Sequence, residues 1–342
     1  MAVPQRSNEI THSNNFDFIR IAAALAVLVS HQHALVGRFE PGVLGIHSLG
    51  GFAVLVFFAI SGYLVTGSWI SDPNLLRFAA RRSLRVWPAL TLVVVVSAYV
   101  LGPWVTELPI GEYLRNKATA KYLSNIWLDT NNALPGVFLN NPHPQTVNGS
   151  IWTIPFEVLC YAIVALVGLA GILKFRFISI ALILIACLWY QLTLGPDLHS
   201  DWKVKQEMIA YFFIGALLFL LRPYWRKRTL IWLTAFVVTA LIAWNSGFRY
   251  LGLMIGLPFV IIYFGTSSTP FIRSFGKLGD PSYGLYLFAF PIQQTIIYFF
   301  WPKFSFIEIL TASIITTTVF AYTSWHCIEK TALKLKPHKP NV

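Results

Sequence analysis

The chain has 342 residues, of which 56% are hydrophobic and 12% are charged. Soluble domains carry roughly 25% charged residues, so half that density excludes a soluble enzyme, and the same composition excludes a disordered or collagen-like chain. Lys and Arg outnumber Asp and Glu by 12. Because no basic stretch carries a recognisable nucleic-acid-binding module, we expect this charge to face anionic membrane lipid and expect no nucleic-acid partner.

The fold class that remains is an all-α, polytopic membrane helix bundle. A helix needs about 20 mainly apolar residues to cross a bilayer, and an open sheet cannot cross it. Ten segments qualify, several of them short. The predicted spans cover 16–36, 48–70, 86–102, 151–171, 177–194, 206–221, 229–245, 250–266, 281–300 and 306–326.

Ten spans place both chain ends on one side of the membrane. With a cytoplasmic N-terminus, the inner segments hold 17 Lys and Arg and the outer segments hold 8, so the positive-inside rule predicts that both termini are cytoplasmic. We expect a cytoplasmic segment over 1–15, one transmembrane domain over 16–326 and a cytoplasmic tail over 327–342. The long outer loop, about 103–150, is expected to form a partly ordered cap. The chain reads as uncleaved and free of disulfides, which suits a bacterial inner membrane.

The first span contains three ionisable residues, Asp17, Arg20 and His31. At 100° per residue, Arg20 and His31 share one helix face and lie roughly 16 Å apart along it. A cation at the inner end and a titratable base further out suit a polar conduit inside the bundle. The alternative is that Arg20 pairs with Asp17 and snorkels, while His31 is a satisfied interfacial histidine.

A basic segment precedes the third span. Arg77, Arg81 and Arg85 follow an i, i+4, i+8 spacing, and Arg82 lies three residues before Arg85. This pattern predicts a basic amphipathic helix at the cytoplasmic interface, whose guanidinium groups could hold phosphates bidentately. The alternative is a basic loop that anchors the protein to lipid.

Glu157 lies two turns into the fourth span, in the outer half and near the depth of His31. A carboxylate in a membrane needs a partner or a proton. We therefore expect Glu157 to pair with His31, which would orient the imidazole and raise its basicity.

Six short motifs follow one another along the chain. They are Arg20 with ten residues before His31, FFAISGY at 57–63, Arg82-x-x-Arg85 followed by Pro88, SIWTIPFE at 150–157, GDPSYGLYL at 279–287 and WHCIEK at 325–330. In this order they resemble the acyltransferase-3 family of membrane acyltransferases over about residues 14–330. The nearest branch resembles bacterial exopolysaccharide, lipopolysaccharide or Nod-factor O-acyltransferases, without the C-terminal esterase-like domain of some members. One departure is FAFP at 288–291, where many members read Leu-Ile-His-x-Pro.

The resemblance implies a reaction and assigns roles to residues. Acyl-CoA, with acetyl-CoA as the default, would be the cytoplasmic donor, and a hydroxyl on a glycan or glycolipid would be the acceptor. No metal is implied. His31 would be the catalytic base, with Glu157 as a second catalytic candidate. The donor-binding residues would be Arg20, Arg81, Arg82 and Arg85, and the pocket residues Ser61, Tyr63, Trp152, Ser282 and Tyr283.

Two other interpretations stay open on the sequence. The same chemistry could act on a small secondary metabolite, or the chain could be a transporter or flippase. Against transport, the sequence has no paired halves with matching broken helices. Within acyl transfer, direct attack by the acceptor and an acyl-histidine intermediate are both open.

Overall fold

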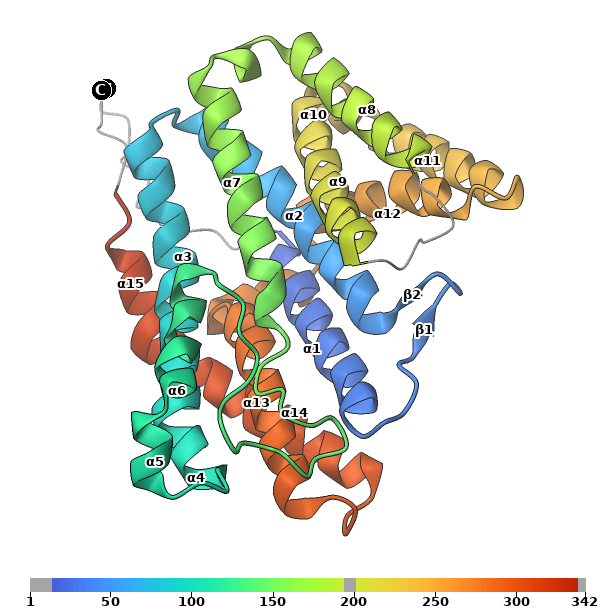
Figure 1. Ribbon diagram of the computed structural model, residues 1–342. Helices are drawn as coiled ribbons and strands as arrows, with labels where there is room; N and C mark the ends of the chain where they lie inside the picture. Colours follow the sequence, from blue (N-terminus) through green and yellow to red (C-terminus); the bar gives the residue numbers. More distant parts are fainter. Residues whose placement is uncertain (1–13, 194–200, 338–342) are drawn as a thin grey trace.

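A computed structural model describes residues 14–193 and 201–337. Within these ranges each predicted span coincides with a long helix (Figure 1), so the predicted helical bundle is confirmed. The long helices are α1 Phe16–Leu35, α2 Leu49–Ser71, α3 Leu75–Val96, α7 Ile154–Leu169, α8 Arg176–Leu192, α9 Asp201–Leu220, α11 Thr229–Asn245, α12 Arg249–Thr266, α13 Ser282–Phe300 and α14 Phe306–Ser324. Among the residues that the structure describes, seven helical stretches are long and apolar enough to cross a membrane, and α8 is a shorter apolar helix.

Short elements connect the long helices. A two-stranded antiparallel hairpin joins α1 to α2. Short helices lie in the outer loop, before α11 and at the C-terminal end. These elements are β1 Gly42–Val43, β2 His47–Ser48, α4 Gly102–Val105, α5 Ile110–Arg115, α6 Lys117–Tyr122, α10 Arg222–Trp225 and α15 Lys330–Lys334.

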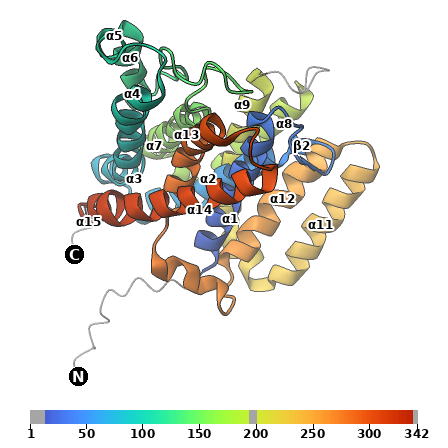
Figure 2. The ribbon, with the colours of Figure 1, turned by 90° about the horizontal axis from the view of Figure 1, so that it is seen from below.

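Helix α2 lies at the centre of the bundle, where it packs against α1, α7, α9 and α12. Its contact with α9 depends on two glycines. A Cβ on Gly62 would lie 1.7 Å from the Phe212 carbonyl oxygen, and one on Gly215 would lie 2.1 Å from the Ala59 carbonyl oxygen. Small residues let two membrane helices approach closely, so these glycines fix how α2 and α9 cross. Helices α11 and α12 form a pair at one edge of the bundle (Figure 2).

The basic segment is helical, as predicted, and it forms the first turns of α3 rather than a separate helix. Helix α3 begins at Leu75 and runs through Pro88, and the chain stays helical as far as Val105. Phe78, Val86 and Leu90 are all buried on one face, so the basic turns and the apolar turns share a single packing surface. Burial of that continuous face offsets the one hydrogen bond that Pro88 removes.

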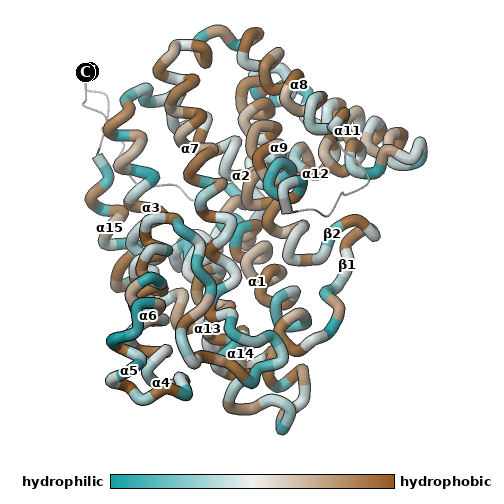
Figure 3. Tube along the Cα trace, in the orientation of Figure 1, coloured by the Kyte–Doolittle hydropathy of each residue, from teal (hydrophilic) through white to brown (hydrophobic). Residues whose placement is uncertain are grey.

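Residues 103–150 form an ordered cap at the end of α3, α7 and α13. Hydrophilic residues concentrate in α6 and the chain that follows it, whereas the long helices are mostly hydrophobic (Figure 3). Two buried asparagines tie the cap to α13, because Asn141 donates to Gln294 and Asn148 donates to the Leu287 carbonyl oxygen. The position of the cap relative to the bundle is therefore set by specific hydrogen bonds.

Candidate active site

Helix α13 lies against α1 along the whole candidate site, and the two helices run in the same direction. Arg20 of α1 contacts Asp280 just before α13, and His31 contacts Phe290 in its middle. Gln293 then donates to the Leu28 carbonyl oxygen and to Gln32. Both functional candidates of α1 therefore face α13, as their spacing predicted. We call the region of Arg20, Arg82, Arg85 and Asp280 the arginine end.

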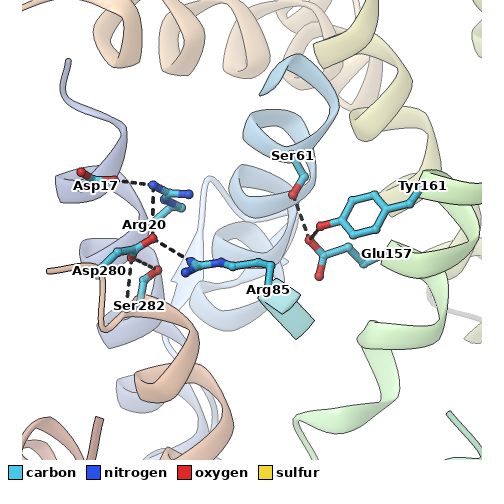
Figure 4. Close-up of polar contacts among 8 residues, drawn as sticks. All are labelled: Asp17, Arg20, Ser61, Arg85, Glu157, Tyr161, Asp280 and Ser282. Carbon is cyan, nitrogen blue, oxygen red and sulfur yellow. Dashed lines mark hydrogen bonds and ion pairs between the residues drawn. The ribbon is translucent and has the colours of Figure 1, made fainter. Parts of the chain in front are cut away.

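Asp280 holds two cations of the arginine end together (Figure 4). Its Oδ2 lies 2.7 Å from an Arg85 nitrogen and 3.3 Å from an Arg20 nitrogen, and Asp17 also binds Arg20. The Ser282 hydroxyl and backbone N–H donate to Oδ1. Burial alone would raise the pKa of Asp280, but Arg20 and Arg85 hold it well below the usual range. The carboxylate is therefore charged at neutral pH and shared by two guanidinium groups.

Asp72 forms a second, similar network between α2 and α3. Arg77 donates to both of its carboxylate oxygens, at 2.9 and 2.6 Å, and Arg81 donates at 2.7 Å. The hydrogen bonds from Arg77, followed by those from Arg81, lower the pKa of Asp72 despite its burial. These two arginines are thus already paired, and Arg81 does not line the cavity described next.

Arg82 lies in a different environment from its neighbours. Within residues 14–193 and 201–337 it forms no ion pair, and its Nε has no hydrogen-bond partner. Its guanidinium group lies 5.8 Å from the centre of the Tyr161 ring. Arg82 is therefore the cation of α3 best placed to accept an anionic ligand.

A cavity extends from the arginine end into the bundle, with about 850 Å³ of space outside protein atoms, including its opening. It lies between α1, α2, α3, α7 and α13. Polar residues at its wall include Arg20, Ser61, Arg82, Arg85, Thr153, Glu157, Tyr161, Ser282, Tyr283 and Tyr286. Seven of the residues predicted from the sequence thus meet at one cavity: three arginines, Glu157, Ser61, Ser282 and Tyr283.

Glu157 does not pair with His31, which corrects our expectation. Its carboxylate accepts a hydrogen bond from Ser61 at 2.9 Å and another from Tyr161 (Figure 4). Helix α7 packs against α2 and α3, and α2 lies between α7 and α1. Glu157 therefore belongs to the cavity wall.

His31 does not line this cavity. Tyr286, whose hydroxyl is 2.7 Å from that of Thr153, lines the cavity one helical turn before Phe290. The His31 ring packs edge-on against Phe290, with 5.2 Å between ring centres. The groups that act electrostatically on it are Glu40 and His143. We call Ser30, His31, Glu40, His143 and Phe290 the histidine end.

Two predicted pocket residues lie elsewhere. Tyr63 is buried against Phe16 and Phe219, at ring distances of 6.0 and 5.3 Å, and has a packing role. Trp152 lines a separate cavity with Phe156 and Lys205. Neither lines the cavity at the arginine end.

Sequence reasoning missed Asp280, Asp72 and Glu40 as site residues, and His143 with them. Asp280 had a usable signal, because it is an acidic residue at the inner end of a span in a strongly basic chain. Gly279 also brings two distant motifs together, since a Cβ there would lie 2.1 Å from Trp325 Nε1. Glu40 and His143 lie in connections without any motif, and no sequence signal marked them.

Comparisons with known proteins show the family of the chain. A family model described as an acyltransferase domain matches residues 13–326. An O-acetyl transferase of Shigella phage Sf6 is 31% identical over 333 residues, which cover 93% of this chain and 95% of the phage protein. Nodulation protein 10 of Rhizobium leguminosarum bv. viciae is 23% identical over 372 residues, covering 97% of this chain and 96% of that protein. No solved structure matches the chain significantly. Because the family model spans nearly all of the helical bundle, the chain belongs to the acyltransferase-3 family of membrane acyltransferases.

Proposed function

We propose that this protein moves an acyl group, acetyl as the default, from cytoplasmic acyl-CoA to a hydroxyl of a surface glycan or glycolipid in a bacterial inner membrane. Family membership and the phage O-acetyl transferase support membrane O-acetylation. The observation that carries the proposal is the arrangement along α13, where a cationic cavity and a histidine lie at successive depths.

The arginine end suits the charged head of CoA. Phosphates bind guanidinium forks well, and a charged head group cannot enter hydrocarbon. Arg82 is the first phosphate contact we expect, because Arg77 and Arg81 already bind Asp72. Arg20 and Arg85 are balanced by Asp17 and Asp280, so among the described residues Arg82 supplies the positive charge that no carboxylate pairs with.

The distance between the two ends suits the pantetheine arm. Ten residues separate Asp280 from Phe290, a rise of roughly 15 Å along a helix. The extended arm is comparable, at roughly 15–20 Å. To reach His31 it has to pass Tyr286, so the arm displaces or runs beside the Thr153–Tyr286 hydrogen bond. We assign Glu157 to this path, where it orients the donor.

The chemistry at the histidine end is general-base transfer. Neutral His31 takes the proton of the acceptor hydroxyl, whose oxygen attacks the thioester carbonyl. Collapse of the tetrahedral intermediate breaks the C–S bond, and the CoA thiolate takes the proton back from His31. An imidazole has a reference pKa near 6.5, so it can perform both proton transfers at neutral pH.

The test is thiol release from acetyl-CoA by purified protein in nanodiscs, with lipopolysaccharide or exopolysaccharide as acceptor. We expect His31→Ala to lower kcat by at least about 100-fold and to keep CoA binding. His33→Ala is the matched control, because His33 on the same helix binds the Val29 carbonyl oxygen and packs on Phe306. Normal turnover by His31→Ala would remove His31 from the mechanism. Absence of CoA binding by the wild type would instead favour the interpretation of the chain as a transporter or flippase.

Direct transfer and an acyl-histidine intermediate differ in one observable. Labelled donor mixed with enzyme and quenched rapidly without acceptor would trap acyl-enzyme in the second mechanism. We propose direct transfer and expect no trapped label at any time point while turnover is intact. Label on His31 that forms as fast as turnover would contradict it.

A further inference from the structure

Two loops bring titratable residues near His31: the segment between α1 and β1 carries Glu40, and the outer loop carries His143. Glu40 comes from the segment between α1 and β1, and its carboxylate accepts a hydrogen bond from Ser30, the residue before His31. Gly50 of α2 makes room for this contact, since a Cβ there would lie 3.0 Å from the Ser30 side chain and 3.6 Å from Glu40 Oε2. Glu40 itself is exposed, so its carboxylate is anchored to α1 and still accessible.

His143, in the outer loop, lies against α13 close to Phe290. Gln294 donates from Nε2 to the carbonyl oxygens of His143 and Thr146, at 2.8 and 2.7 Å, and its own Oε1 accepts from Asn141 at 2.7 Å. Asn141 and Gln294 are buried. The backbone at His143 is therefore fixed to α13, while its side chain is exposed.

The Phe290 ring contacts both His31 and His143. Its ring centre lies 5.2 Å from that of His31 and 6.3 Å from that of His143. Gly149 leaves space for the Phe290 ring, because a Cβ on Gly149 would approach Phe290 Cε2 to 2.6 Å. Within the described residues, the buried Nδ1 of His31 has no hydrogen-bond partner, so this polar group has bonding capacity left for a ligand or a water.

We infer that Glu40 and His143 form the acceptor subsite and bind hydroxyls of a neutral sugar next to the hydroxyl that His31 deprotonates. The inference rests on the proposed function. An exposed carboxylate accepts hydrogen bonds from hydroxyls, and an imidazole can donate or accept one. The Glu40 charge disfavours an acceptor with a carboxylate at this position. Both residues position the acceptor and take no part in proton transfer.

The test separates acceptor binding from catalysis. Glu40→Ala and His143→Ala are compared with wild type for transfer from labelled acetyl-CoA to lipopolysaccharide and exopolysaccharide. Glu107→Ala is the matched control for the first, since Glu107 is an exposed carboxylate in the outer loop that binds Asn140. His33→Ala is the control for the second.

We expect each test variant to raise the acceptor KM by about tenfold, with a smaller change in kcat and a donor KM within about twofold. Control variants should match wild type. Unchanged acceptor KM in both test variants would overturn the inference, and so would a fall in kcat alone, which would mean that they only orient His31. CoA binding by each variant checks folding. No transfer by wild type and controls would instead overturn the proposed function, and the acceptor subsite with it.

Discussion

At the arginine end, Arg20 and Arg85 share the carboxylate of Asp280, whereas at the histidine end the His31 imidazole has two titratable neighbours that come from loops, Glu40 and His143. Paired charges hold their geometry before a ligand arrives, which suits tight binding of an anion. A histidine that must gain and lose a proton cannot be locked by a permanent ion pair. Under the proposed function, donor binding and chemistry would be separated along α13.

The largest effect that tests this contrast is the loss of Asp280. We expect Asp280→Asn to lower the free energy of unfolding by about 3 kcal/mol, because it leaves the largely buried Arg85 without its ion-pair partner and leaves Arg20 with Asp17 alone. Thermal unfolding in nanodiscs measures this change in stability. Asp129→Asn, in an exposed loop position bound to Ser124, is the control and should change stability little. Equal stability of both variants would show that the arginine end does not depend on its carboxylate.

The contribution of Asp280 to the free energy of unfolding depends on pH in a defined way. A carboxylate whose pKa is lowered in the folded protein stabilises it fully above the unfolded value of about 3.9. This contribution is lost progressively as the pH falls from the unfolded value to the lower folded value. The stability difference between wild type and Asp280→Asn should therefore be constant between about pH 7 and pH 5 and shrink below about pH 4, as measured by unfolding at each pH. A difference that already shrinks between pH 7 and pH 5 would contradict the assigned charge state.

A smaller effect distinguishes the cations of α3 from one another. Arg82→Gln should raise the donor KM by about tenfold, since it removes a charged contact to phosphate. Arg77→Gln should leave the donor KM near wild type, because Arg77 is engaged by Asp72. Thiol-release kinetics with varied acetyl-CoA measure both. Equal effects of the two variants would mean that the arginines act only as a diffuse positive field.

The smallest effect concerns Lys336, just after α15. Burial, together with Arg85 and Arg82, lowers the pKa of Lys336 to about 8. The group is therefore charged below this pH and neutral above it, and an anionic donor prefers the charged form. We expect the donor KM to rise by about threefold between about pH 7 and pH 9, and Lys336→Met to abolish the rise. Lys334→Met, at an exposed neighbouring position, should keep it.

The sequence was sufficient for the helices and for the shared face of Arg20 and His31, because hydrophobic runs and a 100° turn per residue determine both. It did not predict the neighbours of Glu157, since the choice between α1 and α2 depends on how whole helices pack. Tyr63 and Trp152 were misplaced for the same reason. Glu40 and His143 could not be predicted, because irregular connections of different length carry them to His31.

The most direct test of the central claim is the sidedness of transfer. Inverted membrane vesicles, with the cytoplasmic face outward, receive labelled acetyl-CoA outside and contain lipopolysaccharide in the lumen. If the arginine end binds the donor from the cytoplasm and the histidine end binds the acceptor from the other side, label should accumulate on the lumenal glycan and be lost in His31→Ala. Right-side-out vesicles given the same external donor should not label glycan. Transfer only to glycan on the same side as acetyl-CoA would contradict the account.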